Sequence, residues 1–263
     1  MRVTVLGSGT SHGVPSIGCD CAVCRSTDPH DRRTRPSILI QLNGDTPSAF
    51  GNRVRSILVD TSTDLREQAL ANDVRRVDAV LFTHTHADHI FGLDDVRRYN
   101  QMQQEAIPCY ADSETVRNLR RIFAYIFQAP RQRGGGLPQL ALFEIGGEFT
   151  LGGADIVPVP LMHGVLPVLG FRIGAFAYLT DCNRIPDSSW PLLDGVRTII
   201  VDALRHKPHS THFSVAEAVD VVRRLGADRA YFTHICHDLP HAATNASLPA
   251  GMELAYDGLV LDI

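Results

Sequence analysis

Residues 83–89 read THTHADH, which places three histidines and an aspartate within six positions. The apolar run VDAVLF comes directly before them and predicts a buried strand. The ligands are therefore expected on a loop at a strand end, where a rigid scaffold holds reactive groups in the open. His84 and His86 can converge on one metal, while Asp88 and His89 follow a turn and can face a second. Imidazole together with carboxylate suits zinc, manganese or iron.

This H-x-H-x-D-H pattern after an apolar strand resembles the signature of the metallo-β-lactamase superfamily of dinuclear metallohydrolases. The resemblance implies an α+β fold, the αββα sandwich, in which two mixed β-sheets pack face to face with helices outside. A lone histidine, an aspartate and a final histidine follow in the order expected of that superfamily. The resemblance implies a bridging Asp181 and two metal sites, which are completed by His84, His86 and His163 at the first and by Asp88, His89 and His234 at the second.

The composition is that of an ordinary globular protein, and we expect one domain over residues 1–263. Hydrophobic residues make up 44% and charged residues 21%, which suits a full core. No apolar run reaches the roughly 18 residues of a membrane span, and the first residues do not resemble a signal peptide. A net charge of −4 argues against general nucleic-acid binding. Six cysteines without a secretory signal predict a reducing, cytoplasmic location.

A second candidate metal site lies in a loop near residues 15–35. Cys19, Cys21 and Cys24 stand close together, and three thiols at this spacing in an intracellular protein form a partial zinc chelate. Structural zinc takes four ligands, so a fourth must come from elsewhere in the chain. A redox-active or merely buried set of thiols is the alternative interpretation.

Accessory motifs narrow the resemblance to the PhnP family of phosphoribosyl cyclic phosphate phosphodiesterases. They are a G-x-P near the N-terminus, the three cysteines and the close pair of His234 and His237. The resemblance implies that His237 completes one structural zinc site, although Cys236 offers a rival thiol. It also implies that His212, in the sequence THFS ahead of a helix predicted at residues 215–225, is the catalytic acid.

Four further features carry weaker expectations. Asp60 ends a predicted strand and can orient a ligand histidine. Residues 205–214 hold three histidines ahead of a helix N-terminus, where anions are favoured. Residues 97–140 contain a glycine-rich stretch and form a candidate lid or insertion. The pair Asp257 and Gly258 is expected to turn a C-terminal hairpin.

The expected function is hydrolysis of a small phosphodiester, such as a cyclic ribosyl or nucleotide phosphate. A hydroxide that bridges two divalent metals, Mn²⁺ or Zn²⁺, attacks phosphorus, and His212 protonates the leaving alkoxide. His212 and Asp88 are the residues expected to act in catalysis. The expected partner is a small-molecule substrate, with neither a nucleic-acid polymer nor a membrane, and a homodimer is compatible with the sequence.

Three other functions stay open. A lactonase or thioester hydrolase would use the same metals without needing His212 or the cysteines. A tRNA 3′-processing nuclease, whose family shares the H-F-S sequence, would need a basic arm rich in glycine and proline, which the sequence does not show. A cofactor-biosynthesis protein of the pyrroloquinoline-quinone B (PqqB) family has a similar cysteine cluster. The complete set of seven ligands favours an active hydrolase, and it does not distinguish manganese from zinc.

Overall fold

Two seven-stranded β-sheets form the centre of the computed structural model, which describes residues 1–42, 55–128 and 136–263. The strand orders are β14-β1-β2-β3-β4-β5-β6 in the first sheet and β13-β12-β11-β10-β9-β8-β7 in the second. The strands of the first sheet are β1 (Arg2–Gly7), β2 (Ser37–Gln41), β3 (Ser56–Val59), β4 (Ala79–Leu81), β5 (Ile107–Ala111), β6 (Leu140–Glu144) and β14 (Val260–Asp262). Those of the second are β7 (Phe149–Leu151), β8 (Ala154–His163), β9 (Leu166–Ile173), β10 (Phe176–Leu179), β11 (Thr198–Asp202), β12 (Arg229–Thr233) and β13 (Met252–Leu254).

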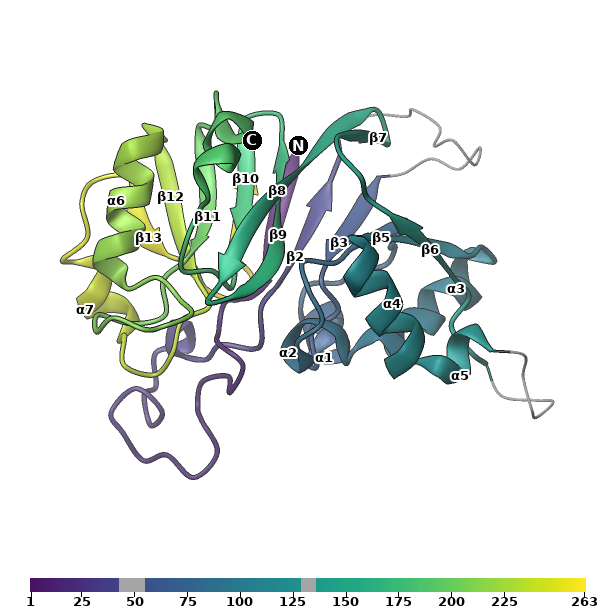
Figure 1. The fold of residues 1–263 in the computed structure, drawn as a ribbon. Helices are drawn as coiled ribbons and strands as arrows, with labels where there is room; N and C mark the ends of the chain where they lie inside the picture. The colour runs from purple at the N-terminus through teal and green to yellow at the C-terminus, as the bar shows by residue number, and fades with distance from the viewer. Residues whose placement is uncertain (43–54, 129–135) are drawn as a thin grey trace.

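Helices lie outside the two sheets (Figure 1). The α-helices are α1 (Leu65–Ala71), α2 (Ala87–Ile90), α3 (Arg97–Gln103), α4 (Ser113–Ile122), α5 (Ala124–Phe127), α6 (Val215–Leu225) and α7 (His241–Asn245). The short 3₁₀ helices are η1 (Pro29–Asp31), η2 (Leu93–Val96) and η3 (Asp187–Leu193). In Figure 1, α6 and α7 lie on the side of the second sheet and α1 to α5 on the side of the first. The expected sandwich of two mixed sheets between helices is confirmed.

Three apolar layers hold the sandwich together, one between the sheets and one between each sheet and its helices. The strand β3 shows how the sequence builds two of these layers at once. Its Ile57 and Val59 belong to the layer between the sheets, and its Leu58 belongs to the layer under the helices. Successive side chains of a strand point to opposite faces, so a strand that is covered on both faces reads as a continuous apolar run.

The strands that carry the candidate ligands run parallel to their neighbours. In the first sheet β3, β4, β5 and β6 are parallel, and in the second β10, β11, β12 and β13 are parallel. The carboxyl ends of parallel strands meet at one edge of a sheet, and ligands bind outside such edges. The loops that follow β3, β4, β10, β11 and β12 can therefore contribute to one site.

The helix α6 begins and ends where the sequence predicted. Ser214 and Glu217 form a capping box, in which each side chain bonds to the backbone N–H of the other residue. Gly226 ends the helix in a left-handed conformation with φ 68°, which glycine adopts without steric cost. Because Ser214 lies two residues after His212, the cap also fixes the direction of the chain that carries this histidine.

The expected C-terminal hairpin is wrong. The strand β13 pairs with β12 in the second sheet, whereas β14 pairs with β1 in the first. Asp257 and Gly258 therefore carry the chain from one sheet to the other. The Asp257 carboxylate accepts hydrogen bonds of 2.6–2.9 Å from the N–H and hydroxyl groups of Ser8 and Thr34. These contacts in the folded protein outweigh the local preference of Asp-Gly for a two-residue hairpin turn.

Residues 97–140 contribute to the first sheet and to its helices. They contain α3, β5, α4 and α5 and the first residue of β6. The glycine-rich stretch on which the candidate lid was based falls largely on residues 129–135, which lie outside the described residues, so the lid stays a prediction. None of the helices that the structure describes is long and apolar enough to cross a membrane.

Candidate active site

Polar side chains from the ends of several strands converge at one end of the sandwich. Asp60 follows β3, while Asp181 and His234 come just after β10 and β12. All three have left-handed backbones, with φ angles of 61°, 54° and 60°. For residues other than glycine this conformation costs about 1–2 kcal/mol each. Strain of this kind is concentrated at functional sites, and all three side chains are buried.

The ligand set expected for the second metal is assembled. Asp88, His89, Asp181 and His234 are buried, and their ligand atoms all lie within 4.8 Å of one another. Nε2 of His89 lies 3.2 Å from Oδ2 of Asp181 and 3.4 Å from Oδ2 of Asp88. Asp88 and His89 belong to the short helix α2 instead of a loop, because a single helical turn begins directly after His86.

The set expected for the first metal shares Asp181 with the second set. The ligand atoms of His84, His86 and Asp181 also lie within 4.8 Å of one another, and Nε2 of His84 is 2.9 Å from Oδ2 of Asp181. His163 borders this group, with its ring centroid 5.1 Å from that of His86. Its Nδ1 lies 2.9 Å from the carbonyl oxygen of Thr211. The same nitrogen lies 3.1 Å from Oδ1 of Asp181, so His163 faces the shared aspartate without joining the group of ligand atoms found there.

The buried polar atoms of this region fit metal binding. Within the described parts of the chain, the buried atoms that make no hydrogen bond include Nε2 of three histidines and one carboxylate oxygen of each of two aspartates. These residues are His84, His89, His234, Asp88 and Asp181. Each unpaired buried atom costs about 1–3 kcal/mol, and divalent cations bound at the two ligand sets would satisfy them. Imidazole and carboxylate are ligands of Zn²⁺ and Mn²⁺, so the residues fit two divalent metals with Asp181 common to both.

Asp60 orients His89, as the sequence suggested. Its Oδ2 lies 2.7 Å from Nδ1 of His89, and its two oxygens accept hydrogen bonds from the backbone N–H and the hydroxyl of Thr83 at 2.9 and 2.8 Å. Burial lowers the pKa of His89, but Asp88 and Asp60 outweigh burial and raise that pKa well above its ordinary value. For His84 burial dominates and lowers the pKa to about 4. Asp60 thus fixes the His89 ring with Nε2 directed away from it.

Asp202 and His212 form a buried pair at the wall of the same site. Nδ1 of His212 lies 2.9 Å from Oδ2 of Asp202, and Asp202 is 0% exposed. The His212 ring stacks on that of His234, with centroids 4.7 Å apart. Burial raises the pKa of Asp202, and the hydrogen bond from His212 offsets this only in part. Asp202 was not predicted, although its position at the end of a buried strand is the signal that marked Asp60.

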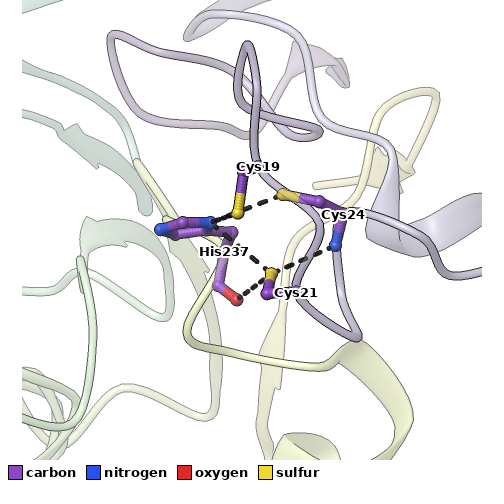
Figure 2. A group of neighbouring side chains, drawn as sticks. All are labelled: Cys19, Cys21, Cys24 and His237. Carbon is purple, nitrogen blue, oxygen red and sulfur yellow. Dashed lines mark hydrogen bonds between the residues drawn. The ribbon is translucent and has the colours of Figure 1, made fainter.

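The three cysteines of the N-terminal loop surround His237 (Figure 2). The sulfur atoms of Cys19, Cys21 and Cys24 lie 3.1, 3.6 and 3.4 Å from Nδ1 of this histidine. Tetrahedral zinc, with bonds of about 2.3 Å to sulfur and about 2.0–2.1 Å to nitrogen, places such atoms about 3.5 Å apart. The four residues therefore fit one zinc ion, and they are the set that the resemblance implied.

Cys236 does not take part in this group. Its sulfur accepts a hydrogen bond of 3.4 Å from the N–H of Asp238. The cluster found among the described residues contains Cys19, Cys21 and Cys24 together with His237. The segment around Cys236 nevertheless connects the two sites, because it supplies His234 to one and His237 to the other. The buried Arg33 donates a hydrogen bond of 3.0 Å to the carbonyl oxygen of Cys236, which attaches the N-terminal loop to this segment.

Comparison with known families agrees with this geometry. A model of the beta-lactamase superfamily domain matches residues 55–235. This range begins just before β3 and ends just after His234, the last expected ligand of the second metal. The chain belongs to the beta-lactamase superfamily. All seven ligands expected for the two catalytic metals lie within the matched residues.

Three proteins of known structure or curated name are similar to this chain. A crystal structure of a diphosphatase from the PhnP family is 46% identical, with a TM-score of 0.89 over 100% of this chain and 97% of that one. The structure of Zn²⁺-bound PqqB from Methylobacterium extorquens is 20% identical, with a TM-score of 0.81 over 100% of both chains, and shows the same fold. An octanoyltransferase of Porphyromonas gingivalis is 38% identical over 98% of this chain and 51% of its own length. The chain thus spans about half of that curated relative.

Proposed function

We propose that this member of the superfamily is a dinuclear metallohydrolase that cleaves a small phosphodiester or diphosphate. The observation that carries the proposal is the Asp202–His212 pair beside two sets of metal ligands. Divalent cations at these sets would supply an acidified water as nucleophile and would neutralise charge on the phosphate. A proton donor next to them suits a reaction in which an oxygen leaves from phosphorus.

His212 acts as the donor through Nε2, because Nδ1 already donates to Asp202. In the charged ring both nitrogens carry protons, and the Asp202 carboxylate stabilises the positive charge. After the transfer Nδ1–H stays bonded to Asp202, so the aspartate selects the tautomer that proton donation leaves behind. The backbone N–H of Cys182 donates a hydrogen bond of 3.2 Å to the same oxygen of Asp202, which helps to hold the carboxylate in place.

The substrate class follows from the leaving group. A ribosyl or nucleotide alkoxide is a poor leaving group and gains most from a general acid. The 46% identical neighbour is a PhnP-family diphosphatase, in agreement with chemistry at phosphorus. We therefore expect a small cyclic ribosyl or nucleotide phosphodiester, or a diphosphate, rather than a nucleic-acid polymer. Asp88 serves this reaction as a ligand of the second metal, with Oδ2 3.5 Å from Nε2 of His234.

Acyl chemistry is the second candidate, because one relative is an octanoyltransferase. The chain matches 51% of that protein, so the remaining half can carry the acyl transfer. A thiol has a pKa near 8.5, far below that of an alcohol, so a thiolate leaves without a proton donor. A thioester would therefore leave the buried Asp202–His212 pair without a function, and the pair favours a substrate whose leaving oxygen needs a proton.

A substrate panel tests the proposal. Purified protein is loaded with Mn²⁺ or Zn²⁺ and offered bis-p-nitrophenyl phosphate, 2′,3′-cyclic AMP, diadenosine diphosphate, a lactone and an octanoyl thioester. We expect hydrolysis of at least one phosphorus substrate, and we expect His84→Ala to lose both that activity and bound metal. Turnover of the acyl substrates alone would overturn the proposal in favour of a lactonase or thioesterase.

A further inference from the structure

The N-terminal loop that carries the three clustered thiols has almost no apolar core of its own (Figure 2). Residues 15–28 form no helix or strand, Val23 is the one buried residue among them, and Ile17 is 98% exposed. The backbone hydrogen bonds within this stretch join residues only three or four positions apart. Metal binding supplies folding free energy to such a segment directly. Zinc held by the thiols and His237 would therefore order the loop.

Both backbone groups of Ile235, the residue after His234, bond to the turn that leads into this loop. The N–H of Ile235 donates a hydrogen bond of 2.9 Å to the carbonyl oxygen of Ser8, and its carbonyl oxygen accepts one of 3.0 Å from the N–H of Thr10. His234 itself has a left-handed backbone with φ 60°. A residue other than glycine keeps this strained conformation only where its surroundings impose it. The N-terminal turn is thus part of what holds His234 at the second ligand set.

The buried Arg33, at the other end of the loop, bonds to both sides of His237. Its guanidinium donates hydrogen bonds of 3.0 and 2.7 Å to the carbonyl oxygens of Cys236 and Leu239. The Arg33 side chain is 0% exposed and pairs with Asp31 at 3.2 Å. Breaking the contacts of a buried charge is strongly unfavourable. The ordered loop and the segment around His237 therefore stabilise each other.

We propose that His237 is a positioning residue for the second catalytic metal, because the cysteine site that it completes holds His234 in its ligating conformation. Three positions separate the two histidines, and the loop or the turn before it bonds to both intervening residues, Ile235 and Cys236. An ordered loop fixes this segment, and the fixed segment presents His234 to the other ligands of its set. The inference rests on the proposed function in that two catalytic metals bind, and it requires no particular substrate.

This arrangement links the cysteine site to one catalytic metal and not to the other. The first ligand set shares Asp181 with the second, but none of its residues belongs to the loop or to the segment 234–237. Zinc at the cysteine site should therefore raise the metal affinity of the second set and leave that of the first nearly unchanged. Coupling between two sites commonly amounts to about 5–150-fold, and it is reciprocal. The second metal should raise the zinc affinity of the cysteine site by the same factor.

Titration of wild type with Mn²⁺, with and without one equivalent of zinc, measures the coupling. Thiolates select zinc, whereas carboxylates suit Mn²⁺, and X-ray absorption at the zinc edge verifies that the zinc has sulfur ligands. Calorimetry gives the two Mn²⁺ affinities, and His234→Ala identifies the one that belongs to the second set. We expect zinc to tighten that affinity by about tenfold, within the usual range of coupling, and to leave the other unchanged.

Four variants separate positioning from general stability. His237→Ala should weaken the second Mn²⁺ affinity as zinc removal does, and added zinc should not restore it. His237→Cys offers four thiolates, a set that also holds structural zinc, and should restore the coupling. Asp238→Asn changes the exposed neighbour of His237 and is the matched control. Leu119→Ala leaves a cavity under α4, which lowers stability away from both sites and should change neither affinity.

The outcomes distinguish this proposal from the proposed function. Equal Mn²⁺ affinities with and without zinc would overturn the assignment of His237, and so would an equal loss at both sets. If His237→Ala does not fold, the comparison within wild type decides alone. Failure of wild type to bind Mn²⁺ at either set would overturn the proposed dinuclear site and the assignment of His237 with it. Turnover of acyl substrates alone would overturn the proposed reaction and leave the coupling intact.

Discussion

Nδ1 of His212 lies 2.9 Å from Oδ2 of Asp202 and 3.1 Å from Oδ1 of Asp181. The candidate proton donor is thus placed between a buried aspartate outside the two expected metal sets and the aspartate common to both of them. A buried carboxylate is tolerated only where a partner compensates its desolvation. The position of Asp202 therefore indicates a function that can be tested separately from metal binding.

The first prediction concerns His212 itself. His212→Ala should keep the metal content of wild type, because His212 belongs to neither of the two expected ligand sets, although its ring also groups with Asp181, Asp202 and His234. A general acid contributes about 10²–10⁴-fold, and most with a poor leaving group. The variant should therefore lose kcat on 2′,3′-cyclic AMP by this factor and far less on bis-p-nitrophenyl phosphate, whose p-nitrophenolate leaves without a proton. Steady-state kinetics on both substrates, with elemental analysis, measure the difference.

Asp202→Asn provides the companion measurement, because it keeps the shape of the side chain and removes the charge that stabilises the imidazolium. It should impair the cyclic nucleotide reaction in the same selective manner. An equal loss on both substrates, or a lost metal in His212→Ala, would show that His212 is not the proton donor.

The second prediction concerns Asp60, which holds Nδ1 of His89 at 2.7 Å. Outer residues that orient a ligand histidine affect metal affinity by about 10–100-fold. Asp60→Asn should weaken binding of the second metal by this amount, as measured by competition with a chromogenic chelator. Asp64→Asn is the control, because Asp64 pairs with Arg35 at 2.9 Å and contacts no ligand. Equal affinities in wild type and Asp60→Asn would show that the ring is held by its neighbours alone.

The sequence predicted the fold because it depends on local patterns, and most of the residues that it offered as metal ligands lie together in the structure. The apolar run before THTHADH corresponds to β4, and the predicted helix at residues 215–225 corresponds to α6. His163, Asp181 and His234 were added to the first motif through the resemblance to the superfamily, because a single polar residue at a strand end is by itself a weak signal.

The sequence failed where the outcome depends on distant partners. The Asp-Gly pair at residues 257–258 predicts a hairpin locally, but Ser8 and Thr34, far away in sequence, determine the path of the chain. Asp202 was missed because its importance comes from His212, which approaches only after the intervening loop has folded. Neither contact leaves a periodic signal in the residues that surround it.

The third prediction concerns thiol reactivity after zinc has been removed. Hydrogen bonds, first from the backbone of Cys24, lower the pKa of Cys21 to about 7, whereas burial raises the pKa of Cys24 to about 11. The thiolate is the reactive form, and its fraction rises as pH passes the pKa. Iodoacetamide should therefore label Cys21 half-maximally near pH 7 and Cys24 only at much higher pH, as resolved by peptide mass spectrometry. Simultaneous labelling of both thiols at neutral pH would contradict this order.

The last prediction tests the cysteine site as a source of stability. Structural zinc contributes folding free energy directly, so Cys21→Ser should lose zinc and lower the melting temperature. A loss of a few kcal/mol corresponds to about 10 °C in a chain of this length. Cys236→Ser is the matched control, because this thiol lies on the same segment as His237 but outside the group of four, and it should keep both zinc and stability.

Mild chelation of wild type should remove the metals of the histidine and aspartate sets before the zinc of the cysteine site. An unchanged melting temperature in Cys21→Ser would show that the site is not structural, and zinc loss in Cys236→Ser would show that Cys236 is a ligand after all.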